Sequence, residues 1–421
     1  MQTTFVIIGI GKSGTAAKNL LLAGGTPSDS VFSFDEKNPA AQFTQWDQIQ
    51  ALPVGTLVVS PGVSLASSQI TALKAKGWKI TSEINLACAY LTDEVVIGIT
   101  GSVGKSTVTS LLGEALINDD LDAFVGGNLG TPFAEYALQL ITKKKKAKYI
   151  ALELSSYQLE NCADLKLDYS AITFLSSNHL ERYPSLDSYY LTKCEIGKKT
   201  KNICVLNESS KDLVQYRTRI EGKTELVSYQ KSNDKAFIEK SQLIGEHNLD
   251  NLAVALRLAK HLKLSPLALE AMTQFKGLSH RLETVGVING NLYINDSKAT
   301  SMDSVLVATQ AALTKTAKTK TLFLLLGGKD KNLPWYELNQ LSQHANISFI
   351  FFGQCGEVAQ LRSQLVGALY TKLGDAVKSI FKNIQPDDVV LLSPGGTSLD
   401  EFKNFEERGN YFKDLVNQKI K

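Results

Sequence analysis

The residues best suited to chemistry lie in one short stretch, where a glycine-rich turn leads into a lysine and two hydroxyl side chains. The turn runs from Gly101 to Gly104 and is followed directly by Lys105, Ser106 and Thr107. Glycines let backbone N–H groups approach phosphate oxygens, and a helix N-terminus adds partial positive charge. The lysine supplies a full charge for the β- and γ-phosphates, and either hydroxyl can reach a magnesium ion. We therefore predict a phosphate-binding loop, rather than a glycine turn that only caps a helix.

The segments on either side of that turn fit this prediction. Residues 95–99 form an apolar run that is typical of a buried strand, and from Val108 onward apolar residues recur at helical spacing. The match to the strict phosphate-loop pattern is imperfect, because Ile99 stands where the pattern has its first glycine and Gly98 lies one place earlier.

Two further groups of polar residues belong to the same part of the chain. Glu153 lies near the carboxyl end of a strand predicted from Tyr149 to Leu154, where an acid is placed to bind magnesium, or else is simply ion-paired. Asn248 and Asn251 are three residues apart in the segment that opens a helix predicted from Leu252 to Leu262, and they share one face. They could hold a base or ribose, or cap the helix.

The first residues carry a second glycine pattern. Gly9 to Gly14 reads G-I-G-K-S-G after a predicted strand, and Asp35 ends the next strand, 21 residues after Gly14. This is the dinucleotide fingerprint, whose acid contacts a ribose hydroxyl. A third predicted strand ends at Ser60 and turns through Pro61 and Gly62. Binding of NAD, binding of another nucleotide and tight helix–strand packing remain open interpretations.

Composition bounds the class of protein. With 421 residues, 43% apolar and 21% charged, the chain should form two or three globular domains. A net charge of +3 is too weak to indicate nucleic-acid binding. The five cysteines include no C-x-x-C pair, and no apolar run is long enough to span a membrane. We expect a cytoplasmic protein without a membrane span.

Strands alternate with helices along the whole chain, which predicts parallel α/β sheets with ligand sites at the carboxyl ends of the strands. We predict three consecutive domains: a Rossmann-like domain at residues 1–92, a phosphate-loop ATPase-like domain at 93–277 and a Rossmann-like domain at 278–421. A hairpin is expected at the start of the last domain, with Asn289 and Gly290 in its turn.

Taken together, the motifs resemble those of the Mur ligases of peptidoglycan synthesis. They occur in the order GSVGKST, GGNLG, ELSSYQLE, HLERYP, GEHNLDN, SHR, NDSKAT, GGKDK and SPGGTSLDEFKNFEERG. Within that family, NDSKAT and SLDEFKNFEERG are most similar to the branch that adds D-glutamate. The resemblance covers nearly the whole chain, more weakly in its first 90 residues.

The resemblance implies ATP-dependent amide-bond formation. The carboxylate of UDP-N-acetylmuramoyl-L-alanine attacks the γ-phosphate to give an acyl phosphate, and the amine of D-glutamate then displaces phosphate. An alternative is another Mur-family or folylpolyglutamate-type ligase with a different acceptor. A nicotinamide-dependent dehydrogenase would leave the phosphate loop unexplained, and a nucleotide-gated switch would need no amino-acid acceptor.

The resemblance also implies a monomer that uses ATP, two magnesium ions and carbon dioxide bound as a lysine carbamate. It further assigns roles to individual residues. Catalytic roles fall to Lys105, His179 and Lys193. Metal contacts fall to Ser106, Glu153, His179 and the carbamate on Lys193. ATP contacts fall to Gly101, Gly104, Lys105, Ser106, Thr107, Asn248, Asn251, Arg281 and Asp296. Contacts to the UDP substrate fall to Gly11, Lys12, Ser13, Asp35 and Asn128. Contacts around the incoming amino acid fall to Lys298, Thr300, Lys331, Ser398 and Phe405.

Overall fold

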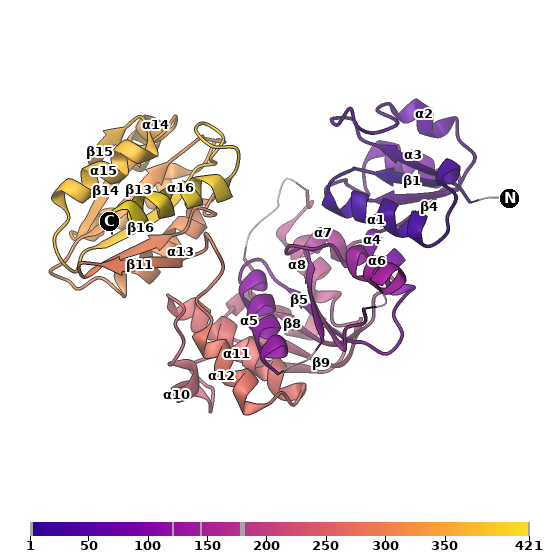
Figure 1. Cartoon of the computed structure of the whole chain (residues 1–421), viewed down its shortest axis with the longest axis horizontal. Coiled ribbons are helices and arrows are strands. Elements are labelled where there is room, and N and C mark those ends of the chain that lie inside the picture. Colours follow the sequence, from indigo (N-terminus) through magenta and orange to yellow (C-terminus); the bar gives the residue numbers. More distant parts are fainter. Residues whose placement is uncertain (1–2, 120–121, 144, 177–181, 420–421) are drawn as a thin grey trace. The chain divides into compact units, whose positions relative to one another are not determined.

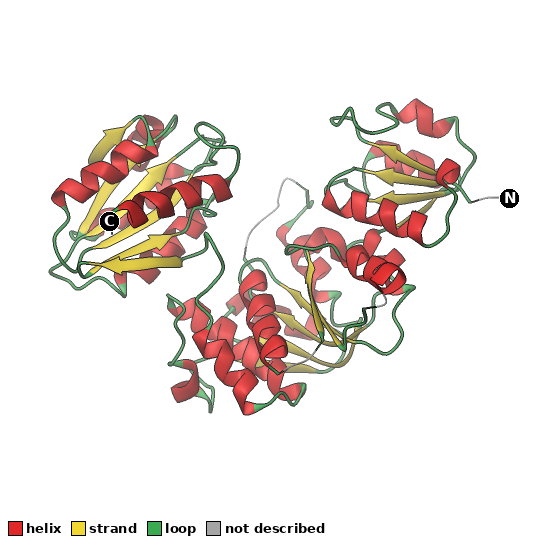
Figure 2. Cartoon of the chain, viewed as in Figure 1, coloured by secondary structure: helices red, strands yellow, loops and turns green. Residues whose placement is uncertain are grey.

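The computed structural model describes residues 3–119, 122–143, 145–176 and 182–419, in which helices alternate with strands of largely parallel sheets (Figures 1 and 2). The chain divides into two compact units. Unit 1 comprises Met1–Ser241 with Asp250–Gln274, and unit 2 comprises Gln242–Leu249 with Phe275–Lys421. The predicted α/β class is confirmed.

The first sheet of unit 1 has the strand order β2-β1-β3-β4, and its neighbouring strands are parallel. Its strands are β1 (Phe5–Ile8), β2 (Val31–Phe34), β3 (Thr56–Val59) and β4 (Lys79–Thr81). Alternate residues of β1 point to opposite faces, so Val6 and Ile8 enter one core cluster and Ile7 enters another. Helices connect the strands: α1 (Lys12–Ala23), η1 (Ser28–Ser30), α2 (Trp46–Gln50), α3 (Ser68–Ala75) and α4 (Glu83–Cys88).

The second sheet of unit 1 has the order β10-β9-β8-β5-β7-β6 and is also parallel. Its strands are β5 (Val95–Thr100), β6 (Ala123–Gly127), β7 (Tyr149–Glu153), β8 (Leu167–Ile172), β9 (Thr200–Asn207) and β10 (Thr224–Val227). Its helices are α5 (Lys105–Asn118), α6 (Phe133–Lys143), α7 (Ser156–Leu159), α8 (Leu186–Cys194), α9 (Lys211–Tyr216), η2 (Arg217–Arg219), α10 (Lys235–Ile238), α11 (Glu246–His261) and α12 (Pro266–Gln274). Since β5 lies between β7 and β8, the loop that follows it is flanked by the ends of both strands.

The two sheets of unit 1 are joined through helices. Residues of α1 and α4 share one hydrophobic core with α6, including Leu20, Ile84 and Phe133. At the start of α4, the buried Glu83 carboxylate accepts a hydrogen bond of 2.8 Å from the N–H of Ala134 in the first turn of α6. A carboxylate at a helix N-terminus is favourably placed for the helix dipole.

Unit 2 holds a six-stranded sheet with the order β11-β12-β16-β13-β14-β15. Its strands are β11 (Glu283–Ile288), β12 (Asn291–Asn295), β13 (Leu322–Gly327), β14 (Ile347–Phe352), β15 (Gly367–Tyr370) and β16 (Val389–Gly395). The helices are α13 (Met302–Leu313), η3 (Trp335–Gln343), α14 (Gly356–Ser363), α15 (Leu373–Asn383) and α16 (Phe405–Gln418). One core cluster contains residues of α13, η3 and α14, and another contains residues of α15 and α16.

The expected hairpin is confirmed. Strands β11 and β12 are antiparallel, and Asn289 and Gly290 between them have φ of 53° and 84°. Two positive φ angles are what a tight two-residue hairpin turn requires. Within the described ranges, every helix is too short or too polar to span a lipid bilayer.

Candidate active site

The predicted phosphate loop lies between β5 and α5, as the strand–turn–helix pattern indicated. Gly104 caps α5 in the left-handed conformation, with φ of 86°, and a Cβ there would come within 2.4 Å of the Asn251 side-chain oxygen. The positive φ therefore favours glycine at this position, and an added Cβ would also displace the Asn251 side chain. Gly98 has a different role, because a Cβ there would meet Leu167 at 2.6 Å. The imperfect match to the loop pattern thus reflects a packing glycine inside β5.

The side chain of Lys105 folds back and binds the backbone of the loop. Lys105 Nζ donates hydrogen bonds to the carbonyl oxygens of Gly101 (2.9 Å) and Ser102 (3.1 Å). Ser106 is buried in the first turn of α5, and Thr107 beside it is half-buried. These positions leave N–H groups, hydroxyls and one cation at a helix N-terminus, which together can bind phosphate.

Lys193 lies against the same loop, although it is 92 residues away in sequence. Its Nζ donates to the carbonyl oxygen of Gly101 at 2.9 Å and lies 4.7 Å from the centre of the Tyr189 ring. The side chain is 1% exposed. Burial, together with the nearby charge of Lys105, holds the pKa of Lys193 well below its usual value, while Glu153 acts in the opposite direction.

Glu153 ends β7 next to the phosphate loop, since it pairs with Ile99 of β5. It is 2% exposed, and its Oε1 accepts a hydrogen bond of 2.6 Å from the side-chain amide of Asn128. Its Oε2 is buried without a hydrogen-bond partner among the residues that the structure describes. A buried carboxylate oxygen with no donor beside it is suited to a hard cation. His179, the other predicted metal-binding residue, lies outside the described residues, and in the described part of the chain no three His, Cys, Asp or Glu side chains cluster as metal ligands.

A cleft of about 450 Å³ opens at the carboxyl ends of the first sheet and is shared with the loop after β6. All five residues predicted to bind the UDP substrate line it: Gly11, Lys12, Ser13, Asp35 and Asn128. Asp35 is held in place by N–H groups of Ile10, Lys37 and Asn38, and these hydrogen bonds, that from Lys37 foremost, lower its pKa. Because Asn128 contacts both the cleft and Glu153, the cleft is connected directly to the phosphate-loop region.

The predicted acceptor residues lie at the carboxyl ends of the strands of unit 2, which we call the acceptor edge. Lys298 and Thr300 follow β12, Lys331 follows β13, Ser398 follows β16, and Phe405 begins α16. The loops after β13 and β16 are joined by two hydrogen bonds between Lys329 and Thr397, at 2.8 and 2.9 Å. Lys298 Nζ lies 4.8 Å from the centre of the Phe405 ring.

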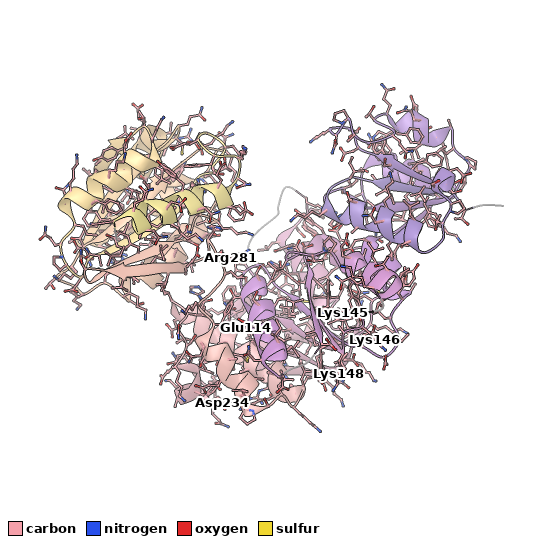
Figure 3. The ribbon with its side chains drawn as sticks, viewed as in Figure 1. Glu114, Lys145, Lys146, Lys148, Asp234 and Arg281 are labelled. Carbon is pink, nitrogen blue, oxygen red and sulfur yellow. The ribbon has the colours of Figure 1, made fainter. Side chains whose placement is uncertain are left out.

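Asp296 and Arg281 belong to the same edge. Figure 3 labels Arg281 in the turn ahead of β11. Asp296 is buried and accepts hydrogen bonds from the Leu282 N–H (3.1 Å) and the Ser393 hydroxyl (3.0 Å). Burial raises the pKa of Asp296 to about 7, and the charge of Arg281 acts against this rise.

The two predicted ATP-binding asparagines lie in α11, which begins six residues earlier than the helix predicted from Leu252. Asn251 belongs to unit 1 and adjoins Gly104, whereas Asn248 belongs to unit 2 and donates to the carbonyl oxygen of Ile244 at 2.8 Å. A joint contact of both residues with one adenosine therefore stays a prediction.

Sequence reasoning missed two arginines, one buried and one partly buried. Arg408 is 0% exposed and donates to the Ser297 hydroxyl (3.0 Å) and to the carbonyl oxygens of Ser297 (2.7 Å) and Gly396 (3.1 Å). It thus ties the loop after β12 to the loop after β16. A signal was present, because Arg408 falls at helical spacing between Phe405 and Phe412, on the apolar face of α16. Arg182, the second one, contacts the turn after β3.

Comparison with known proteins agrees with this geometry. A family model described as the Mur ligase middle domain matches residues 99–259. The chain is 34% identical over 444 residues to the UDP-N-acetylmuramoylalanine–D-glutamate ligase of Escherichia coli strain K12. It is 33% identical over 446 residues to the ligase of the same name of Salmonella choleraesuis, and both matches cover 98% of each chain.

Solved structures show the same fold. The UDP-N-acetylmuramate-alanine ligase of Thermotoga maritima has a TM-score of 0.60 at 16% identity, with 99% of this chain and 100% of that chain covered. The UDP-N-acetylmuramoylalanyl-D-glutamyl-2,6-diaminopimelate–D-alanyl-D-alanyl ligase of Acinetobacter baumannii has a TM-score of 0.61 at 14% identity, with 95% and 98% covered. Taken with the near full-length sequence relationship, these findings show that the chain belongs to the Mur ligase family.

Proposed function

We propose that this chain joins D-glutamate to UDP-N-acetylmuramoyl-L-alanine in peptidoglycan precursor synthesis, converting ATP to ADP and phosphate. The observation that carries the proposal is the identity of 34% along 98% of the chain to a ligase named for this reaction. The NDSKAT and SLDEFKNFEERG segments support D-glutamate over other acceptors. We further infer that the enzyme acts as a monomer in the cytoplasm, where its nucleotide substrates are made.

The chemistry of the proposed reaction needs charge neutralisation more than covalent help. The carboxylate of the UDP substrate forms a bond to the γ-phosphorus, and ADP leaves. The amine of D-glutamate then forms the amide bond, and the carbon–oxygen bond to phosphate breaks. Lys105 neutralises charge on the phosphates, and the N–H groups at the start of α5 hold them in line.

Mur ligases use ATP and Mg²⁺, and Glu153 and Ser106 fit such an ion. Both are buried oxygen ligands next to the phosphate loop, and Glu153 has a carboxylate oxygen without a hydrogen-bond partner among the described residues. When bound, the ion would neutralise phosphate charge and orient the phosphates. Two such ions, the second near His179, remain part of the proposal.

We also propose a carbamate on Lys193. The ammonium first loses a proton. Carbon dioxide then forms a carbon–nitrogen bond with the neutral amine, and a second proton is lost, so that overall a cation becomes an anion. Supporting this, Lys193 is buried beside Lys105, and a second cation there would be repelled while an anion would be attracted.

The acceptor edge is the proposed site for D-glutamate, through Lys298, Thr300, Lys331, Ser398 and Phe405. Lysine cations and hydroxyl donors suit a dicarboxylate. Asn248, Arg281 and Asp296 are proposed to contact ATP from the same unit.

The deciding experiment is phosphate release with ATP, magnesium and UDP-N-acetylmuramoyl-L-alanine across a panel of D- and L-amino acids. We expect release to depend on the UDP substrate and to be highest with D-glutamate. Release that is highest with another amino acid would favour a sister ligase. Release without any acceptor would favour a nucleotide switch, and NADH oxidation would favour a dehydrogenase.

A further inference from the structure

The turn after β3, at residues 60–63, is bound by the side chain of one arginine, Arg182. Arg182 Nη1 donates to the Pro61 carbonyl oxygen at 3.0 Å, and Nη2 lies 3.4 Å from the Val63 carbonyl oxygen. These two carbonyls belong to a turn of the first sheet, whereas Arg182 leads into α8 beside the second sheet. The turn lines the substrate cleft through Pro61, Gly62 and Val63.

The guanidinium is itself fixed on its other sides. Its Nη2 lies 2.7 Å from the Glu160 carboxylate, and its carbon lies 4.2 Å from the centre of the Tyr157 ring. The other carboxylate oxygen of Glu160 accepts a hydrogen bond from the Tyr183 hydroxyl. Because the side chains of Arg182 and Glu160 are only 11% and 20% exposed, this ion pair is shielded from solvent and held in one geometry.

Holding the Pro61 carbonyl has a consequence for the neighbouring N–H group. The C=O and N–H of one trans peptide point in opposite directions, so the N–H of Gly62 points away from Arg182. Among the described residues, no acceptor binds this N–H, whereas the next one, of Val63, is used by the Ser60 carbonyl at 3.0 Å. Gly62 lines the cleft, and no atom lies within 4 Å of an added Cβ, so the space on the Cβ side of this residue is open.

The remaining side of the turn is also fixed. The Ser60 hydroxyl donates to the Gly9 carbonyl oxygen at 2.7 Å, which joins the turn to the glycine loop that begins α1. The turn therefore has a hydrogen bond toward the glycine loop on one side and the arginine on the other. These two contacts hold the Gly62 N–H in one direction.

We propose that Arg182 is a positioning residue that aims the Gly62 N–H into the cleft, where it donates to an anionic oxygen of the nucleotide substrate. Glu160 and Tyr157 hold the guanidinium so that it can reach both carbonyls. This inference rests on the proposed function, because it takes the cleft as the site of the UDP substrate. The pair acts through geometry: the charge of Arg182 is balanced by Glu160, so a lysine in its place is a poor substitute.

The test is calorimetric binding of UDP-N-acetylmuramoyl-L-alanine and of ATP to full-length variants. For Arg182→Met we expect about tenfold weaker binding of the UDP substrate, with ATP binding changed less than twofold and kcat at saturation changed less than threefold. Arg182→Lys should recover less than half of the loss on a logarithmic scale. The matched control is Arg257→Met, because Arg257 forms a comparable ion pair with Glu225 at 2.9 Å away from the cleft. It should leave both affinities unchanged.

A further variant separates positioning from general stability. Glu160→Gln keeps a hydrogen-bonding partner and should weaken UDP-substrate binding about threefold, which tests the idea even if Arg182→Met does not fold. Unchanged UDP-substrate affinity in Arg182→Met and Glu160→Gln would overturn the inference. A wild-type protein that does not bind the UDP substrate at all would instead overturn the proposed function.

Discussion

Two buried basic side chains, one in each unit, respond differently to burial. Lys193 in unit 1 and Arg408 in unit 2 are among the largest fully buried side chains of the described chain. Lys193 donates to the Gly101 carbonyl and faces the charge of Lys105, and its pKa falls well below the usual value. Arg408 donates three hydrogen bonds, and burial lowers its pKa only to about 10.

The difference follows from the side chains and their surroundings. A guanidinium spreads its charge over a planar group with five donors, so carbonyl and hydroxyl oxygens can satisfy it in a buried site. An ammonium is strongly hydrated, and burial next to another cation favours its neutral form. Burial thus favours the neutral amine of Lys193, the form that the proposed carbamate requires, whereas Arg408 links the loops of the acceptor edge through its hydrogen bonds.

The largest expected effect tests the phosphate loop beside Lys193. We expect Lys105→Ala to slow phosphate release about 10³-fold, because charge that develops on the transferred phosphate is no longer neutralised. Colorimetric phosphate release measures this, and calorimetric binding of the UDP substrate should be unchanged. Turnover within tenfold of wild type would contradict the assignment of the loop.

The next effect concerns the other cation. Arg408→Met leaves a hydroxyl and two carbonyl oxygens without their donor, and we expect a loss of about 3 kcal/mol in the free energy of unfolding. The KM for D-glutamate should also rise, since the loops after β12 and β16 lose their link. Urea unfolding checks the first result and initial rates the second. The control is Arg362→Met, because the Arg362 side chain is half-exposed. Equal free energies of unfolding of the two variants would contradict a stabilising role of Arg408.

Substitution of Lys193 tests the reactive side of the comparison. We expect Lys193→Ala to slow phosphate release about 10²-fold, a typical cost for the loss of one charged group at a site of phosphate transfer. Added acetate should restore part of the activity by replacing the carbamate carboxylate. Carbon-13 NMR with labelled CO₂ should show a carbamate signal in wild type that is absent from the variant. No rescue and no signal would count against the carbamate.

The smallest effect is a pH dependence of stability at Glu83. Burial raises its pKa to about 7, against the opposing hydrogen bond from the Ala134 N–H. A carboxyl with a raised pKa in the folded state stabilises the protein below its ordinary pKa, and this contribution is lost as pH rises through 7. From pH 6 to pH 8 we expect the free energy of unfolding of unit 1 to fall by about 1 kcal/mol. Glu83→Gln should remove that slope in urea unfolding, and an unchanged slope would exclude Glu83 as its origin.

Much of the fold could be predicted because its signals are local. Strands such as β1, β2 and β14 are mostly apolar, and the glycine turn before Lys105 lies between a strand and a helix. Strand β4 escaped prediction because its three residues include one apolar side chain. The first turn of α11, before Leu252, escaped prediction because it is polar and shows no apolar period.

The site could be predicted in part for the same reason. Residues of glycine turns were found from spacing, and the five predicted cleft residues do line one cleft. By contrast, no local pattern in the sequence marks Lys193, and only the family resemblance points to a role. Its burial arises when α8 packs beside the phosphate loop, and no local pattern contains that contact. Arg182 was missed likewise, since its partners at Pro61 and Val63 are about 120 residues away.

The central claim is that ATP activates a carboxylate brought to the phosphate loop from the cleft. It is tested most directly with UDP-N-acetylmuramoyl-L-alanine whose alanyl carboxylate carries oxygen-18 in both positions. If an acyl phosphate forms and the amine of D-glutamate displaces phosphate from it, one labelled oxygen leaves with each phosphate and the other stays in the new amide. We predict singly labelled phosphate by mass spectrometry, and unlabelled phosphate released during amide formation would contradict the account.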